Sequence, residues 1–224
     1  MRKSRSFSSQ IIRKGKKVGK IYYYKLTVDD GGAPCVQNEI LSLAICKPRI
    51  RTGANEGDWV FGFAANSLDS NNRLIYIAEV TDKERGGEYY RSSKYAGRAD
   101  RIYRSLGDEY AWRPRARYHG KPGDLQRDLG QPPRYPRAQV LLSSEFRYFG
   151  SSGSSAYKTK FPYVKNAVEK LGQGERVNHP DMLRNELMRL KGESWRRFRD
   201  KVCGDPHQLP DVTACHRTRS FGEC

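Results

Sequence analysis

The chain has 224 residues, and its 42 Lys and Arg against 25 Asp and Glu give a formal net charge of +17. This length allows one large domain or two small ones with a sizeable core, and 37% hydrophobic residues place the chain above the composition of disordered proteins. No apolar run approaches the ~20 residues of a membrane helix. The five cysteines form no CxxC pair. We therefore expect a protein of the reducing cytoplasm, neither secreted nor membrane-spanning, without a disulfide scaffold or zinc ribbon.

The positive charge is concentrated in three parts of the chain. Residues 1–20 carry +8, residues 91–150 carry +7 and residues 151–224 carry +5, whereas residues 21–90 carry −3. Clustered arginines interleaved with aromatic residues are typical of proteins that bind polyanions. We therefore expect DNA or a modified nucleotide as the partner, and general basicity is the alternative explanation.

The N-terminal half predicts a basic arm followed by a group of strands. Residues 1–19 are expected to be disordered, because their cations repel one another. The next four β-rich segments are residues 21–28, 41–46, 59–63 and 74–80. Turns rich in Gly, Asp and Pro separate them, and Gly62 indicates a bulge or a close approach within its strand. These short loops predict a small curved antiparallel sheet or a barrel.

The C-terminal half predicts a polar loop, two more strands and helices. Residues 84–137 alternate charged and aromatic side chains without a clean period and read as a long loop, with one short helix near residues 89–95. Strand-like composition returns at residues 138–149. Apolar residues at i, i+3, i+4 and i+7 predict a helix within residues 161–172, and a second helix begins near Pro180. We predict an α+β fold with one domain at residues 20–203, C-terminal helices and a flexible tail at residues 204–224.

Two segments, CKPRIR at residues 46–51 and GDWVFGF at residues 57–63, are the most distinctive of the chain. Together with residues 30–34, 74–80, 89–90, 98–103 and 140–150, they resemble the nucleotide modification associated domain, type two. The resemblance covers roughly residues 20–172, and Ala99 departs from it where a glycine is expected. The resemblance implies a family of bacteria and phages that gene neighbourhoods link to the synthesis or handling of hypermodified DNA bases.

A second resemblance concerns the architecture. Gly57-Asp58 precedes an apolar strand, a polar loop and a strand that ends in Glu79-Val80. This order is similar to the PUA-like group, which includes the EVE and ASCH domains. It implies a small pseudo-barrel that holds a nucleobase, so a PUA-like pseudo-barrel stands beside the curved sheet as the expected fold.

Basic residues in the segments of resemblance are candidates for phosphate binding. Lys47, Arg49 and Arg51 follow a predicted strand, where arginine offers a bidentate fork to a phosphate. Arg98 and Arg101 lie in a later segment and are added as phosphate contacts. A solvated strand end is the alternative for the first group.

Aromatic residues are candidates for stacking on a base. Base–aromatic stacking contributes about 1–3 kcal/mol per base, and Trp59, Tyr89 and Tyr90 are the rings that we expect to supply it. Core packing is the alternative for Trp59, which begins a strand.

The sequence offers weak candidates for catalysis and none for a cofactor or a resident metal. Asp30, Asp58 and His119 are the titratable candidates, although turn caps and a loop histidine without a role are the alternatives. No histidine lies near Cys46 in sequence to activate it, so we interpret Cys46 as a buried structural thiol. No Walker A or Rossmann glycine pattern occurs. The spacing of the cysteines and histidines after residue 202 fits no zinc module.

These observations lead to one functional expectation and one alternative. We expect a protein that binds a nucleotide or nucleic acid and recognises or handles (hyper)modified DNA bases. The alternative is an enzyme that takes part in DNA base hypermodification, which the resemblance suggests and no pair of residues adjacent in the sequence supports.

Overall fold

The computed structural model describes residues 19–207. The expected basic arm therefore lies outside the described residues except for Gly19, and most of the expected C-terminal tail does too. None of the described helices is long and apolar enough to cross a membrane.

The fold is α+β, as predicted, and its centre is an open five-stranded sheet with the order β10-β5-β4-β1-β11. Its strands are β1 (Ile21–Leu26), β4 (Trp59–Ala64), β5 (Leu74–Glu79), β10 (Glu145–Tyr148) and β11 (Glu175–Arg176). β1 and β4 run parallel, whereas the other neighbouring strands run antiparallel.

A second, four-stranded antiparallel sheet has the order β2-β3-β9-β6. Its strands are β2 (Cys35–Gln37), β3 (Ile40–Leu43), β6 (Asp82–Glu84) and β9 (Val140–Ser143). The described strands form no closed barrel, so small antiparallel sheets describe the fold and the PUA-like pseudo-barrel is not confirmed.

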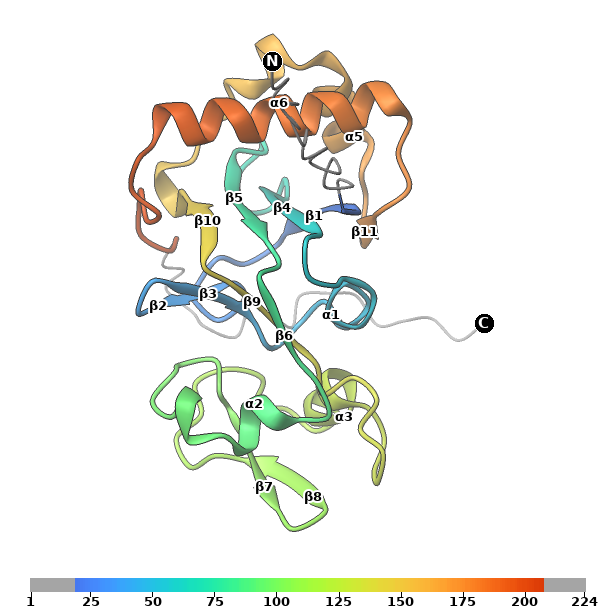
Figure 1. Cartoon of the computed structure of the whole chain (residues 1–224), viewed down its shortest axis with the longest axis vertical. Helices are drawn as coiled ribbons and strands as arrows, with labels where there is room; N and C mark the ends of the chain where they lie inside the picture. The colour runs from blue at the N-terminus through green and yellow to red at the C-terminus, as the bar shows by residue number, and fades with distance from the viewer. Residues whose placement is uncertain (1–18, 208–224) are drawn as a thin grey trace, which may run out of the picture.

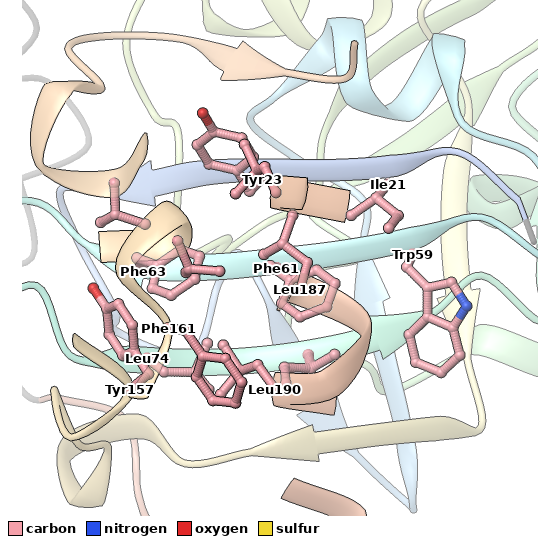
Figure 2. Close-up of a cluster of buried hydrophobic side chains, with 14 of the residues drawn as sticks. Ile21, Tyr23, Trp59, Phe61, Phe63, Leu74, Tyr157, Phe161, Leu187 and Leu190 are labelled. Carbon is pink, nitrogen blue, oxygen red and sulfur yellow. The ribbon is translucent and has the colours of Figure 1, made fainter. Parts of the chain in front are cut away.

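The five-stranded sheet is covered on both faces. All six residues of β1 are buried, and its apolar residues alternate between two clusters because successive side chains of a strand point to opposite faces. Ile21 and Tyr23 face the C-terminal helices, as Figure 2 shows, whereas Tyr22 and Tyr24 belong to the cluster that includes the four-stranded sheet.

The C-terminal helices lie across one end of the molecule (Figure 1). They are the 3-10 turn η2 (Gly150–Ser152), α4 (Tyr157–Lys160), α5 (Pro162–Lys170) and α6 (Asp181–Arg197). The buried residues of α5 and α6 pack on the sheet, and both helices lie where the apolar spacing predicted them.

Residues 85–139, between β6 and β9, form a lobe at the opposite end of the molecule (Figure 1), which we call the arginine-rich lobe. Its elements are α2 (Glu88–Arg91), the 3-10 turn η1 (Ser93–Tyr95), the hairpin of β7 (Tyr103–Leu106) and β8 (Glu109–Trp112), and α3 (Asp124–Leu129). Six tyrosines dominate its separate core. A further short helix, α1 (Pro48–Gly53), follows β3. The hairpin, α1 and α3 were not predicted from the sequence.

Gly62 lies at an irregularity of the sheet, as its position in the sequence suggested. The register between β4 and β5 shifts after Gly62, and a Cβ at this position would lie 2.3 Å from the ring of Tyr76. We expect Gly62→Ala to lower the free energy of unfolding by about 1–3 kcal/mol, because the cross-strand ring has to move. Urea denaturation measures this change.

The matched control is Gly192→Ala in α6, where an added Cβ meets nothing within 4 Å. Alanine favours a helix interior over glycine by about 1 kcal/mol, so this variant should be more stable than the parent. Equal stabilities of the two variants would contradict the close approach at Gly62.

Candidate active site

Cys46 lies in the short connection between β3 and α1. Cys46 and Lys47 both have left-handed backbones, with φ of 58° and 40°, a conformation that non-glycine residues rarely adopt. Pro48 begins α1 directly after them, and the buried guanidinium of Arg51 donates from Nε to the Cys46 carbonyl at 2.7 Å. The strained turn is therefore held in place from within the helix that follows it.

The thiol of Cys46 meets a histidine and an aspartate from the arginine-rich lobe. The Cys46 Sγ lies 3.0 Å from Nε2 of His119, and His119 Nδ1 lies 2.5 Å from Oδ2 of Asp128. The other carboxylate oxygen, Oδ1, accepts the backbone N–H of Cys46 at 3.0 Å. A nucleophile, a base and a group that orients the base are thus assembled in the order that thiol and hydroxyl enzymes use.

Asp128 has further partners that fix its position. The hydroxyl of Tyr103 donates to Oδ2 at 2.8 Å, and Arg51 Nη2 donates to the Asp128 carbonyl at 2.7 Å. The Arg51 guanidinium also lies 3.8 Å from Oδ1, and both side chains are fully buried. One strand and one loop of the lobe, and one helix of the central fold, therefore converge on this carboxylate.

The surroundings of His119 favour its charged form. Burial alone would lower its pKa, but the hydrogen bonds and the charges of Asp128 and Cys46 outweigh burial and raise the pKa of His119 to about 10. The pKa of Asp128 shifts in the opposite direction. Burial would raise its pKa, but the hydrogen bond and charge of His119, together with Arg51, lower it. At neutral pH the pair is therefore an imidazolium beside a carboxylate.

The three residues differ in exposure. The side chains of His119 and Asp128 are fully buried, whereas Cys46 is half-buried. Cys46 is therefore the most exposed of the three residues, and the imidazolium is shielded from bulk water. The ring of Tyr24 lies next to this place, with the Lys47 ammonium 4.7 Å from its centroid.

Sequence reasoning named one member of this group as a candidate and gave another a structural role. His119 was a candidate, but Cys46 was interpreted as structural because no histidine lies near it in the sequence. The structure brings His119 to it across 73 residues. Asp128 was missed, since an aspartate in a short helical segment carries no signal of its own.

The residues expected to bind phosphate are placed in three different ways. Lys47 adjoins Cys46, and its Nζ donates to the carbonyl of Lys25. Arg49 is exposed and pairs with Glu175 at 2.5 Å. Arg51 is fully buried, and its remaining donors bond the carbonyls of residues 137 and 139.

Arg98 and Arg101 serve the interior of the lobe in this structure. Buried Arg98 donates to the Tyr89 hydroxyl at 2.9 Å and to carbonyls of β2 and its flanks. Arg101 donates to the carbonyls of Tyr89 and Tyr90. The phosphate-binding roles of these arginines stay predictions, and those of Arg51 and Arg98 would require these buried groups to leave their present partners.

The expected stacking rings are also inside the protein. Trp59 packs edge-on against Trp195 with centroids 5.6 Å apart, and Tyr89 and Tyr90 lie in the core of the lobe. The exposed fractions of the three rings are 6%, 0% and 1%. Their stacking role stays a prediction that needs the rings to become accessible.

The two candidate aspartates lie in turns away from the triad. Asp58 accepts the backbone N–H groups of Lys20 and Asn55, as a turn cap does. Asp30 accepts the N–H of Gly32 through Oδ1, while its buried Oδ2 has no hydrogen-bond partner among the described residues. Neither is in hydrogen-bond contact with Cys46, His119 or Asp128.

The described chain is thus an α+β protein whose cysteine–histidine–aspartate site lies between its central sheets and an arginine-rich lobe. The model of the family described as nucleotide modification associated domain 2 matches residues 18–209, so the chain belongs to this family. No curated protein and no solved structure matches the chain. Within residues 19–207, no group of three or more His, Cys, Asp or Glu side chains is arranged to hold a metal ion.

The imidazolium beside Cys46 leads to a prediction about thiol reactivity. We expect iodoacetamide at pH 6 to alkylate Cys46 at least about tenfold faster than Cys203, because the adjacent cation favours the thiolate. Burial raises the pKa of Cys203 and, with Asp100, raises the pKa of Cys35 to about 12. Mass spectrometry measures the labelling, and cleavage after Glu39 separates the peptides of Cys35 and Cys46.

The variant His119→Gln should remove the advantage of Cys46, since glutamine carries no charge. Labelling of Cys203 in the same variant reports whether the fold is intact. Equal rates at Cys46 and Cys203 in the parent protein would show that the imidazolium does not activate the thiol.

The raised pKa of His119 leads to a second prediction. Because its folded pKa lies above the ordinary value of about 6.5, protonation of His119 stabilises the fold below that pH, and this stabilisation is lost as the pH rises through about 10. Nitrogen-15 NMR at pH 7.5 should show His119 as an imidazolium. His179, whose pKa is lowered mainly by burial, should be neutral. Asp128→Asn should lower the pKa of His119 by more than one unit, and a neutral His119 in the parent at pH 7.5 would contradict the ion pair.

Proposed function

We propose that this chain is an enzyme of nucleotide modification in which Cys46 is the nucleophile, His119 transfers the proton and Asp128 orients His119. The observation that carries the proposal is the pair of contacts at 3.0 Å and 2.5 Å on the two nitrogens of one imidazole. The proposal favours the enzyme over the simple binding module that the sequence alone made the first expectation.

The chemistry of this arrangement is attack on an electrophilic carbon, as in acyl or amide transfer. The Cys46 thiolate forms a bond to the carbon, and His119 gives its Nε2 proton to the nitrogen or oxygen that leaves. Water or another acceptor then attacks the thioester, His119 takes its proton, and the thiolate is restored. The cycle uses only groups of this chain and its substrates.

The substrate class follows from the family and from this chemistry together. The family name associates the domain with nucleotide modification, and a thiol nucleophile acts on acyl, amide or ester carbon. We propose that the reacting carbon belongs to a group carried by a hypermodified DNA base. Recognition of the modified base is then a part of the reaction, because the enzyme has to hold the base while Cys46 attacks.

Intact-protein mass spectrometry tests this function. The protein is incubated with nucleotides and oligonucleotides that carry an amide or ester on the base, and we expect a covalent adduct at Cys46 followed by release of product. Cys46→Ala should abolish both, and His119→Gln should lower turnover by about 10²–10⁴-fold, the usual contribution of general acid–base catalysis.

Cys203→Ala is the matched control, because this half-buried thiol has no histidine partner among the described residues and bonds only the carbonyl of Asp200. It should leave adduct formation and turnover unchanged. Tight binding of the modified base with no adduct and no turnover would instead identify the chain as a binding module.

A further inference from the structure

The loop that carries His119 is rich in cations and has no carboxylate. Residues 113–123, between β8 and α3, include Arg113, Arg115, Arg117 and Lys121 and no Asp or Glu. Hydrogen bonds hold the backbone of this loop in place. The indole N–H of Trp112 donates to the carbonyl of His119, and the backbone N–H of Lys121 donates to Asp124 at 3.0 Å. Its charges are therefore presented on a fixed backbone.

Three of these cations are exposed and unneutralised. Arg115, Arg117 and Lys121 are exposed, and none of them forms an ion pair with a carboxylate of residues 19–207. Arg117 stands 5.8 Å from the ring centroid of Tyr118, which leaves its charge in place. By contrast, Arg127 in the next helix pairs with Asp124 at 2.6 Å. The loop thus offers positive charge that no described group balances.

Two of these cations lie next to His119 in the chain. Arg117 and Lys121 are each two residues from His119, so their Cα atoms lie within about 7 Å of its Cα. The His119 ring in turn contacts the Cys46 sulfur. An anion held by this loop is therefore placed near the residue that contacts the half-buried thiol.

The charge of the whole lobe exceeds what the phosphate of one nucleotide requires. Residues 85–139 contain ten exposed cations and three exposed carboxylates. The exposed cations are Arg85, Arg91, Lys94, Arg104, Arg115, Arg117, Lys121, Arg127, Arg134 and Arg137. This excess of exposed positive charge favours a ligand with regularly spaced negative charges, such as a nucleic-acid strand.

We propose that the loop of residues 113–123 binds the phosphates of a nucleic-acid strand and holds one of its bases at Cys46. The proposal rests on the proposed function for the reaction at Cys46. Strand binding itself needs no thiol and can be measured without it.

The test measures binding of a fluorescently labelled, single-stranded 20-nucleotide DNA to full-length Cys46→Ser over a range of salt concentrations. The same measurement is made after adding Arg115→Gln, Arg117→Gln and Lys121→Gln together. Each phosphate contact on a single strand contributes a slope of about 0.7 in log K against log salt. Loss of three contacts should lower the slope by about 2 and weaken binding about a hundredfold at 0.1 M salt.

The matched control removes three exposed charges from the helices at the other end of the molecule, with Lys165→Gln, Lys170→Gln and Arg196→Gln. It should bind almost as tightly as Cys46→Ser. Both triple variants keep residues 1–18, so the basic residues there contribute equally to every measurement.

Three results would overturn the proposal. They are no measurable binding by Cys46→Ser, equal losses in the loop and control variants, and a nucleoside monophosphate that binds as tightly as the strand. Iodoacetamide labelling of Cys46 in the loop variant, made in the chain with its cysteine, shows whether the fold is intact. The two proposals can be contradicted independently. An unreactive Cys46 contradicts the proposed enzyme activity, whereas a strand affinity that the loop substitutions leave unchanged contradicts strand binding by residues 113–123.

Discussion

The buried carboxylate of Asp128 is the point on which the candidate site depends. A fully buried carboxylate is costly unless it is paired and hydrogen-bonded. Here His119 and Tyr103 share one oxygen, and the Cys46 N–H and the Arg51 guanidinium approach the other. Satisfying this one group therefore fixes the imidazole ring, the strained turn of the thiol and the start of α1 relative to one another.

The parts of the fold that were predictable are those whose composition or period is regular. β1, β4 and β5 consist almost entirely of apolar or aromatic residues, and α5 follows the helical spacing of its buried residues. The arginine-rich lobe has no such regularity, because tyrosines and arginines share its interior and its elements contain at most six residues. Because tyrosines form most of this core, the sequence shows no hydrophobic periodicity here. The hairpin and α3 could therefore not be predicted from it.

The site was only partly predictable, for a related reason. Arginine near a strand end suggests a surface that binds phosphate, but a lobe with little regular structure has many backbone carbonyls that need donors. Arg51 supplies donors to three carbonyls of the lobe, and Arg98, which belongs to the lobe, bonds carbonyls of β2. Both side chains are buried in this structure, and the sequence does not report burial. His119 was recognisable as a candidate, but its pairing with Cys46 depends on contacts across 73 residues.

The triad lies at the junction between the central sheets and the arginine-rich lobe. This location explains why a buried arginine makes several hydrogen bonds there. The thiol belongs to the connection after β3, whereas the histidine and the aspartate belong to the lobe, so a small shift between the two parts would separate Sγ from Nε2. Arg51 bridges this junction, since its guanidinium bonds Cys46 on one side and the carbonyls of Asp128, Arg137 and Gln139 on the other. Because a planar guanidinium holds its donors in a rigid fork, these bonds fix an orientation as well as a distance. Arg51 is therefore best understood as the residue that holds the Cys46 turn in position against the lobe that carries His119 and Asp128.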